Sequence, residues 1–181
     1  MPHGADRFSA GDVMDAFFCV EVHPDDRKKL AVRTHNRHLE FEVMVQGWVN
    51  SHSHFCRIIA GAMDGLGRFN VQAYLDDVLN HSSGFDSHFA TQQLVYDRLR
   101  LNQLMFKPSK TNLNFREIKF LGHILSPEGI APDPAKVESV NNIEEPRDVT
   151  GVRSFLGATL FYRRFIHGYG DIAQPLYALT K

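Results

Sequence analysis

The segment Ala73–Asn80, AYLDDVLN, places two adjacent carboxylates, Asp76 and Asp77, between two short apolar runs. Apolar and polar residues alternate over 69–74, and apolar residues return at 78–79. Alternation with a period of two is typical of a β-strand with one buried face. The stretch therefore predicts a β-hairpin with the two carboxylates at or beside its turn.

The acidic pair has an ordinary interpretation and a functional one. Aspartate favours tight turns, where it caps its own backbone. The apolar flanks, however, partly remove Asp76 and Asp77 from water, and a divalent cation would relieve the repulsion between them. A third carboxylate, Asp12, opens a segment that we place as a neighbouring strand of the same sheet. Three carboxylates from two strands make an oxygen-only site that suits Mg²⁺. Two ions ~4 Å apart would clamp both oxygens of a phosphoryl transfer.

Composition narrows the class of protein. The chain has 181 residues, of which 43% are hydrophobic and 23% charged, which is typical of one globular domain with at most a small appendage. No apolar run approaches the ~18 residues that span a bilayer, and the first residues lack the apolar core of a signal peptide. Cys19 and Cys56 form no C-x-x-C pair. We expect an intracellular protein without a membrane partner.

Two local patterns have unremarkable interpretations when taken alone. His52 and His54 lie two residues apart without a third ligand nearby, which favours solvated or helix-cap histidines over a zinc site. The net charge of −1 argues against binding nucleic acid through total charge. Basic residues nevertheless cluster over 98–119, where Glu117 is the single acid. Such a run is most often a solvated face, unless its neighbours give it another role.

Hydrophobic periodicity divides the first two-thirds of the chain into strands and helices. Alternation over 18–22 and 39–45 predicts two strands that pair as an antiparallel ribbon across a polar connection. The period then changes to that of an amphipathic helix over 55–66. A longer helix is predicted over 86–104. Its buried face is expected to carry Phe89, Val95 and Leu99, with Leu94 and Leu101 beside them.

The last third of the chain contains further signals for where strands and helices begin and end. Two short strands and a turn are predicted over 120–129. Asp133 followed by Pro134 is typical of a helix N-cap with proline at the first helical position. Two more helices are expected over 148–161 and 171–179. The order of elements predicts an α+β fold, in which an antiparallel sheet packs on helices and a mainly helical extension follows.

These segments resemble a known family. The YLDD turn between strands resembles the metal-binding hairpin of reverse transcriptases, and Asp12–Thr34 resembles their first catalytic motif. Gln46–Ser51, QGWVNS, resembles the motif that lines the nucleotide pocket. The segments Phe106–Val140 and Glu144–Ile166 are similar to the gypsy-type LTR retrotransposon subgroup. YLDD alone is a weak signal, but four motifs in order at family-like spacings, covering about Phe8 to Lys181, are a strong one.

The resemblance implies a fold and a function. Residues 1–118 would form a polymerase palm, with a remnant of the fingers around 23–45, and residues 119–181 a primer-grip hairpin and thumb. The activity implied is RNA-directed DNA polymerisation by two-metal nucleotidyl transfer, with two Mg²⁺ ions, or Mn²⁺ instead. Its partners would be an RNA or DNA template with primer, deoxynucleoside triphosphates, and the fingers, connection and RNase H of a parent polyprotein. The implied location is the cytoplasm, a virus-like particle or the nucleus.

The resemblance also assigns roles to residues near the acidic pair. Asp12, Asp76 and Asp77 would be the catalytic metal ligands, with Val13 supplying a backbone carbonyl. Lys110 would donate a proton to the leaving pyrophosphate, although a phosphate-contacting or solvated lysine is an equal alternative. Phe17 would lie beneath the incoming sugar and exclude a 2′-hydroxyl, although plain core packing also accounts for it. The remaining expected substrate contacts are Gln46, Gly47 and Tyr74.

A second set of residues is expected to contact the nucleic acid backbone. These residues lie in the basic window, in the hairpin FLGHILS and in the thumb-like helices. They are Arg98, Lys107, Lys119, Gly122, His123, Arg153, Arg163 and Arg164. Phe161 and Tyr162 are expected to pack in the core rather than to stack on bases.

The chain departs from the family pattern in ways that leave alternatives open. Only eleven residues precede Asp12, the chain ends at PLYALTK, and Val45 and His52 stand where the family commonly has proline. We therefore expect a fragment with little polymerase activity in isolation. One alternative is a catalytically inactive remnant that only binds nucleic acid. Another is an unrelated Mg²⁺ phosphohydrolase, which leaves the thumb-like segment unexplained.

Overall fold

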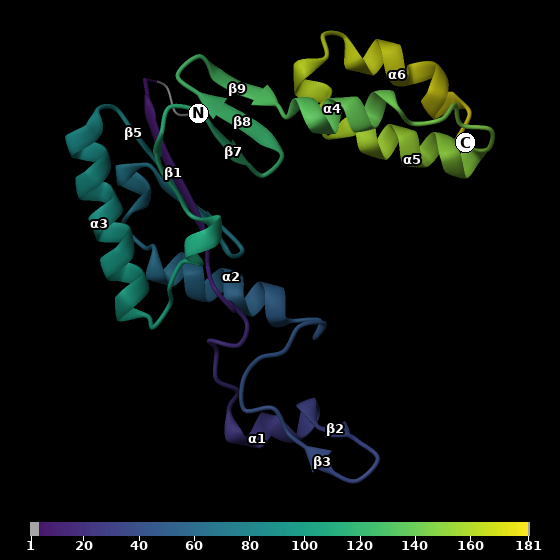
Figure 1. The fold of residues 1–181 in the computed structure, drawn as a ribbon. Coiled ribbons are helices and arrows are strands. Elements are labelled where there is room, and N and C mark those ends of the chain that lie inside the picture. The colour runs from purple at the N-terminus through teal and green to yellow at the C-terminus, as the bar shows by residue number, and fades with distance from the viewer. Residues whose placement is uncertain (1–3, 181) are drawn as a thin grey trace. The chain divides into compact units, whose positions relative to one another are not determined.

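The computed structural model describes residues 4–180 and divides the chain into two compact units. The first unit ends at Ile118 and the second begins at Lys119. Figure 1 shows the elements of each unit, coloured along the chain. Among residues 4–180, no helix is both long enough and apolar enough to cross a membrane.

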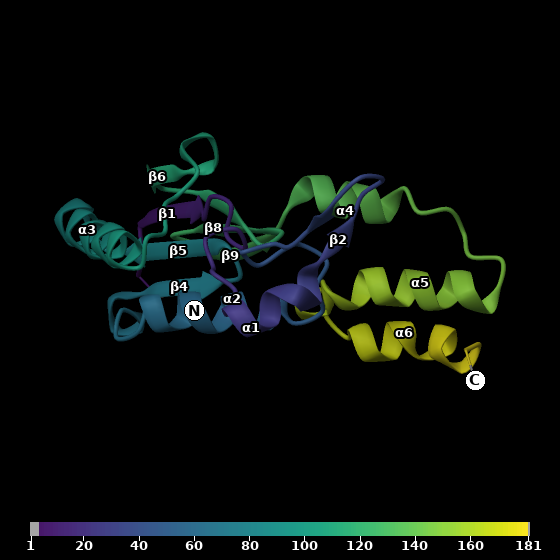
Figure 2. The same ribbon diagram turned by 90° about the horizontal axis from the view of Figure 1, so that it is seen from below.

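A four-stranded sheet organises the first unit, and its strands pair antiparallel in an order that differs from the sequence order. The two strands of the predicted hairpin lie at one side of the sheet, and the first strand of the chain inserts beside them (Figures 1 and 2). From one edge to the other the strands are β4 (Val71–Tyr74), β5 (Asp77–Ser82), β1 (Arg7–Asp12) and β6 (Asn112–Phe115).

Two helices cover one face of this sheet. Helix α2 (Ser51–Ala62) packs against β4, and α3 (Phe85–Leu101) packs against β5 and β1 (Figure 1). Phe55, Ile59, Val95 and Leu99 are each at most 2% exposed and belong to one hydrophobic cluster. Burial of this cluster is the main stabilising term of the unit, because each such side chain contributes ~1.5–3 kcal/mol.

The pairing register separates the side chains of the sheet into two faces. Gly11 lies opposite Val78, and Val78 belongs to the cluster with the helices, so alternate residues from these two face the helices. Asp12 lies opposite Asp77, one residue after Gly11 in β1 and one residue before Val78 in β5. The two carboxylates therefore stand on the face opposite to α2 and α3.

A buried polar network fastens α3 to the sheet. The imidazole of His88 is hydrogen-bonded through Nε2 to Ser9 Oγ at 2.7 Å and through Nδ1 to Ser82 Oγ at 2.8 Å. Asn114 N–H donates to the same Ser9 oxygen at 2.9 Å. Burial lowers the pKa of His88, and the charge of Arg7 lowers it further, so the ring is neutral at pH 7. The network ties β1, β5, β6 and α3 together without burying a charge.

The first predicted ribbon is only partly correct. Asp12 ends a strand instead of opening one, and residues 15–20 form turns rather than a strand. Asp15 has φ of +50°, which breaks the extended backbone after β1. The two segments do pair antiparallel, but through isolated bonds from Val22 N–H to Glu42 C=O and from Met44 N–H to Val20 C=O, both 2.8 Å.

Short elements occupy the region between these bonds. The predicted charged turn contains the helix α1 (Pro24–Arg27), which Pro24 begins. The polar connection is closed by a two-residue ladder between β2 (Val32–Arg33) and β3 (His38–Leu39). This regular strand pairing lies nearer the turn than the strand that was predicted from the alternation over 39–45.

The helix predicted over 86–104 is present as α3, but its buried face differs from the prediction. Val95 and Leu99 are 1% exposed as expected, whereas Phe89 is 54% exposed and Leu101 is 78% exposed. The buried residues are His88, Thr91, Gln92, Val95 and Leu99, which follow helical spacing. Polar groups on this face hydrogen-bond to the sheet, so apolar residues alone did not mark it.

The second unit combines a small antiparallel sheet with three helices. The sheet has three strands where two were predicted, namely β7 (Ile118–Phe120), β8 (His123–Ser126) and β9 (Gly129–Pro132). The helices are α4 (Pro134–Asn141), α5 (Val149–Leu160) and α6 (Tyr169–Ala178), close to the predicted ranges.

Local capping sets where two of these helices begin. Asp133 accepts a hydrogen bond from Ala135 N–H at 3.1 Å, and Pro134 follows as predicted. Asp148 caps α5 by accepting from Gly151 N–H at 2.6 Å. Helix α5 packs on α6 through the buried residues Val152, Leu156 and Ala173.

Candidate active site

The sheet register brings the three predicted carboxylates together. Asp12 and Asp77 are direct cross-strand partners of β1 and β5, and residues in that relation lie ~4.5–5.5 Å apart at Cβ. Asp76 lies in the turn between β4 and β5, where Leu75 has φ of +54°. The carbonyl of Asp76 accepts a hydrogen bond from Val13 N–H at 2.7 Å. The register thus places Asp12 opposite Asp77, with Asp76 next to it in the turn, and a shared cation site stays a prediction.

A lysine from a distant part of the chain reaches this cluster. Lys110 Nζ lies 2.9 Å from Asp12 Oδ2, although the two residues are 98 positions apart. The backbone next to Lys110 continues the pairing of β1. Met14 N–H donates to Met105 C=O, and Lys107 N–H donates to Asp12 C=O, both at 2.8 Å. The segment that bears Lys110 is thus bonded directly to the residues around Asp12.

The electrostatics of the cluster are those of an anionic site with one cationic neighbour. Burial raises the pKa of Asp77 above its ordinary value, the charges of Asp76 and Asp12 raise it further, and Lys110 offsets part of this. The hydrogen bond that Lys110 donates to Asp12 raises the pKa of Lys110, so its ammonium is charged at neutral pH. Bringing a divalent cation to these carboxylates would lower their mutual repulsion.

The donor set fits an oxygen-binding cation, but the side chains are not yet gathered around one point. Asp12, Asp76 and Asp77 offer only carboxylate oxygens, the ligands that Mg²⁺ and Mn²⁺ prefer. Within residues 4–180, no three acidic, histidine or cysteine side chains already form an arrangement that could hold an ion. One oxygen of Asp12 is engaged with Lys110. The carboxylates would therefore turn toward an ion when it binds.

Phe17 lies at the edge of the hydrophobic core after β1. Its ring makes edge-to-face contacts with His52, at a centroid distance of 5.2 Å, and with Phe55, at 5.9 Å. It is partly buried and packs against the cluster that includes Val13, which is 2% exposed. Phe17 thus packs against the core, and its partial exposure also leaves a surface that a substrate could contact, so its role stays a prediction.

The other expected substrate residues occupy two different places. Tyr74 lies directly opposite Asp77 in the register of β4 and β5 and is 58% exposed. Gln46 and Gly47 lie outside the sheet, in the loop between β3 and α2. Gly47 has φ of +86° and open space where a Cβ would lie, so it permits a left-handed turn and a close approach to the backbone.

The basic residues of the first unit do not share one surface. Lys107 and Lys110 belong to the segment that pairs with the end of β1. Arg98 is exposed on α3, whose opposite side packs on the helix-covered face of the sheet. The structure therefore does not bring Arg98 to the face that carries Asp12 and Asp77, because the helical period turns it away from the sheet.

The predicted residues of the small sheet are held by partners within the second unit. Lys119 Nζ lies 3.1 Å from Asp133 Oδ1, and this contact lowers the pKa of Asp133. Gly122, with φ of +76°, completes a tight turn between β7 and β8 after Leu121, which has φ of +48°. Both residues have positive φ, as a two-residue hairpin turn requires.

Aromatic rings surround the histidine at this turn. His123 is hydrogen-bonded through Nδ1 to Leu121 C=O at 3.0 Å. Its ring lies 5.0 Å from the ring of Phe161 and 5.8 Å from that of Phe165. Phe161 also contacts Tyr162 edge-to-face at 4.9 Å, but it is 52% exposed, so the prediction that it packs in the core is wrong.

The predicted arginines of the thumb-like helices are all exposed, and two of them have structural contacts. Arg153 donates to Thr180 C=O at 2.8 Å. Arg164 lies 4.9 Å from the centroid of the Phe165 ring, a cation–π contact. Arg163 is exposed at the start of the short 3-10 helix Arg163–Phe165.

Sequence reasoning missed two residues next to the cluster. Gly11 precedes Asp12 inside a strand, and Phe106 packs against it at the start of the Lys110 segment. A glycine within a strand is a recognised signal for close approach of another group, but the sequence pattern did not predict β1, so this signal could not be read.

Comparisons with known proteins agree with this geometry. A family model described as "Reverse transcriptase (RNA-dependent DNA polymerase)" matches residues 2–125. The Drosophila melanogaster "Retrovirus-related Pol polyprotein from transposon 297" is 32% identical over 96% of this chain. The corresponding polyprotein from transposon opus is 30% identical over 96%. The Tf2-3 polyprotein of Schizosaccharomyces pombe is 27% identical over 98%. The chain spans only 13–17% of the length of these relatives.

Solved structures share the fold. A foamy viral protease-reverse transcriptase in complex with an RNA/DNA hybrid aligns with a TM-score of 0.82 at 22% identity, over 97% of this chain and 24% of that one. The same viral protein in complex with double-stranded DNA aligns with a TM-score of 0.87 over 96% of this chain and 36% of that one. From the family match and the transposon relatives we conclude that the chain belongs to the reverse transcriptase (RNA-dependent DNA polymerase) family.

Proposed function

We propose that this chain is the palm and thumb portion of a transposon polyprotein that performs RNA-directed DNA synthesis. One observation carries the proposal: Asp12 and Asp77 are cross-strand partners, Asp76 lies in the adjoining turn, and Lys110 reaches Asp12. In this proposal the first unit is the palm, with residues 23–45 belonging to the fingers. Residues 119–181 supply a primer-grip hairpin and the thumb.

In this proposal Asp12, Asp76 and Asp77 hold two Mg²⁺ ions, or Mn²⁺, together with the backbone carbonyl of Val13. When bound, such ions activate the primer hydroxyl and neutralise charge on the triphosphate. The raised pKa of Asp77 supports this role, because it reports carboxylates held close together and partly away from water. The antiparallel register holds the backbones of Asp12 and Asp77 opposite one another before any ligand arrives.

Lys110 is assigned a second role in the same step. The oxygen of the primer hydroxyl bonds to the α-phosphorus as its proton passes to solvent, the bond from phosphorus to the bridging oxygen breaks, and pyrophosphate leaves with a developing negative charge. The Lys110 ammonium would donate a proton or a charge-assisted hydrogen bond to this leaving group. If the Asp12 carboxylate turned toward a bound ion, the Lys110 ammonium would be released from Asp12 Oδ2 and could meet the pyrophosphate.

Residues around the carboxylates would select and place the nucleotide. The ring of Phe17, held edge-to-face by His52 and Phe55, would lie beneath the sugar and leave no room for a 2′-hydroxyl. Tyr74 stands beside Asp77 and is exposed enough to contact the primer end or the base pair. Gln46 and Gly47 would contact the incoming nucleotide from the loop before α2.

The proposed partners are a primer–template and the rest of a polyprotein. Exposed cations of the Lys107 segment and of the 3-10 helix with Arg163 and Arg164 are suited to backbone phosphates. Connection and RNase H regions are expected in the parent, as are further fingers residues. The proposed location is inside the cell, in the cytoplasm, a virus-like particle or the nucleus, and the likeness to transposon polyproteins supports it.

Binding of Mn²⁺, followed by electron paramagnetic resonance, tests the site without requiring activity. Asp12→Asn and Asp77→Asn should each weaken Mn²⁺ binding by at least ~10-fold, a loss typical of perturbed metal sites. Asp64→Asn is the matched control, because Asp64 is exposed beyond the end of α2. Equal Mn²⁺ affinity in all three variants would contradict the assignment.

Primer extension on an RNA template, with Mg²⁺ and deoxynucleotides, tests the reaction itself. Asp76→Asn should lower the extension rate by ~10²-fold or more, as does loss of one preorganised electrostatic group. Extension that Asp76→Asn leaves intact would overturn the mechanism. Tight Mn²⁺ and hybrid binding without extension, even by the full polymerase of the parent polyprotein, would instead favour a non-catalytic remnant.

A further inference from the structure

Gly11 leaves a space that a distant aromatic ring occupies. Gly11 is the residue before Asp12 at the end of β1. A Cβ placed on Gly11 would lie 2.7 Å from Cγ and Cδ1 of Phe106 and 2.9 Å from its Cδ2. These separations are well inside carbon–carbon contact, which is ~3.5–4.0 Å. The ring of Phe106 therefore packs directly on the Gly11 backbone.

Phe106 anchors the segment that bears Lys110. Its side chain is 8% exposed, and its backbone forms an isolated bridge with Val13. The residues on either side are bonded to β1 and its continuation, through Met105 C=O and Lys107 N–H. Three residues after Lys107, the ammonium of Lys110 meets Asp12. The position of the Phe106 ring thus determines how the Met105–Lys110 segment passes Asp12.

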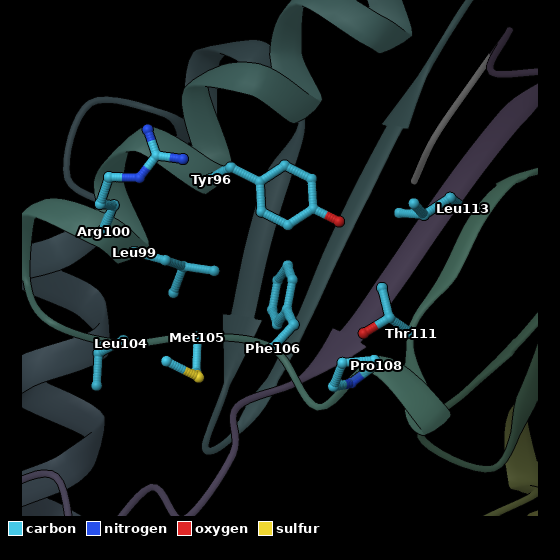
Figure 3. A pocket seen from close by; sticks show the side chains of 9 residues that line it. All are labelled: Tyr96, Leu99, Arg100, Leu104, Met105, Phe106, Pro108, Thr111 and Leu113. Atoms are coloured by element: carbon cyan, nitrogen blue, oxygen red, sulfur yellow. The ribbon is translucent and has the colours of Figure 1, made fainter.

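The same ring also borders a cavity. The cavity has a volume of ≈ 450 Å³, and its lining comes from α3 and from the segment 104–113, not from β1 (Figure 3). Figure 3 shows Phe106 next to Tyr96, whose ring meets it edge-to-face at a centroid distance of 5.7 Å. Phe106 accordingly has the Gly11 backbone on one side and open volume on another. A group added at Gly11 would push the ring toward the cavity.

We propose that Gly11 and Phe106 act as a pair of positioning residues, which together set the placement of Lys110 relative to Asp12. The proposal rests on the proposed function for the role of Lys110, but the packing argument itself does not. Neither residue touches the substrate. They act through the Met105–Lys110 segment, which follows the ring. A displacement of ~1 Å at a reacting group is enough to cost ~10²-fold in rate.

Gly11→Ala is the direct test, and the cavity makes it informative. Since the ring can move into open volume, the variant is expected to fold, with near-native far-ultraviolet circular dichroism. Amide hydrogen exchange should then accelerate at Lys107, whose N–H is bonded to Asp12, and remain unchanged at Val95 and Leu99 in α3. Gly61→Ala is the matched control, because Gly61 lies within α2 with open space where its Cβ would lie. Unchanged exchange at Lys107 in Gly11→Ala would overturn the packing argument.

Primer extension by a double-mutant cycle then separates positioning from general damage. Gly11→Ala should lower kcat by ~10²-fold while leaving KM for the deoxynucleotide unchanged. Combined with Lys110→Ala it should add little, because both changes remove the same contribution. Fully additive losses would mean that Gly11 does not act through Lys110. Because little extension is expected from the isolated chain, the cycle is measured in the polymerase of the parent polyprotein. No extension there would overturn the proposed function, while hydrogen exchange still decides the positioning argument.

Discussion

The two units of the chain differ in how they arrange charged side chains: the first holds like charges together, and the second pairs opposite charges. In the first unit, Asp12 and Asp77 are held on one face of the sheet, and burial and repulsion raise the pKa of Asp77. In the second unit, Lys119 and Asp133 form an ion pair, and the pKa of Asp133 is lowered. Like charges held together disfavour folding, whereas an opposite pair at a helix N-cap favours it.

This difference distinguishes charged residues with a proposed catalytic role from charged residues that stabilise the fold. A cluster of like charges persists only where the surrounding fold holds it and where a ligand gains from it. The first unit supplies that support through the His88 network and the bonds between β1 and the Lys107 segment. In the second unit, several cations that the sequence suggested for nucleic acid already have contacts within the unit, as Lys119 and Arg153 do.

The largest expected effect concerns binding of an RNA–DNA hybrid. If six or more cations contact phosphates, affinity should fall by ~10³-fold between 50 and 200 mM salt and vary little with sequence. Arg163→Ala should reduce the logarithmic salt slope by ~1, whereas Lys119→Met should reduce it less, because Asp133 already neutralises that cation. Filter binding at several salt concentrations measures both slopes. An affinity that does not change with salt would contradict nucleic acid binding. Equal salt slopes for Arg163→Ala and Lys119→Met would contradict the expected difference between these two cations.

The second prediction compares how replacement of Asp77 and replacement of Asp133 change the pH dependence of Tm. Asp77 has a raised pKa in the folded state, so the stability it contributes in its protonated form is lost as pH rises through that value. Asp77→Asn should therefore raise Tm at pH 7, by up to ~4 °C for a chain of this size. Near the unfolded pKa of ~3.9 the gain should vanish. Mg²⁺ should raise Tm of the unaltered chain at pH 7 and not that of the variant.

Replacement of Asp133 should shift Tm at pH 7 in the direction opposite to that expected for Asp77. Its folded pKa is lowered, so its contribution is present above the unfolded value of ~3.9 and is lost as pH falls through the folded pKa. Asp133→Asn keeps an N-cap side chain but removes the charge, so Tm at pH 7 should fall slightly. Thermal melts of both variants from pH 3 to pH 8 test the pair. Shifts of the same sign at pH 7 would contradict the assignment of one cluster to chemistry and the other to structure.

The smallest expected effect concerns the contact between His52 and Phe17. His52 lies in the first turn of α2, where proline is tolerated because the N–H is not needed by the helix. His52→Pro removes an edge-to-face contact and should change the preference for deoxy- over ribonucleotides by less than ~10-fold, since such ring pairs contribute ~0.5–1.5 kcal/mol. His54→Ala is the control, because His54 contacts Arg57 instead. Kinetics of single-nucleotide incorporation would show whether the two variants differ.

Much of the fold could be predicted because its signals are local. Alternation around AYLDDVLN predicted the β4–β5 hairpin, helical spacing predicted α2 and α3, and Asp133 with Pro134 predicted the start of α4. These features depend on residues within a few positions of each other. The order of the motifs likewise indicated the family, and with it the three carboxylates.

The remaining features depend on contacts between distant segments, and only the tertiary structure decided them. Strand β1 was not predicted, because Phe8, Ser9 and Gly11 are all buried, so polar and apolar residues do not alternate along it. The register that places Asp12 opposite Asp77 arises from long-range pairing, and so does the approach of Lys110 across 98 positions. The fit of Phe106 on Gly11 depends on the shapes of two segments that meet only when the chain has folded. Sequence pattern reports which face of an element is buried, whereas packing decides which side chains meet there.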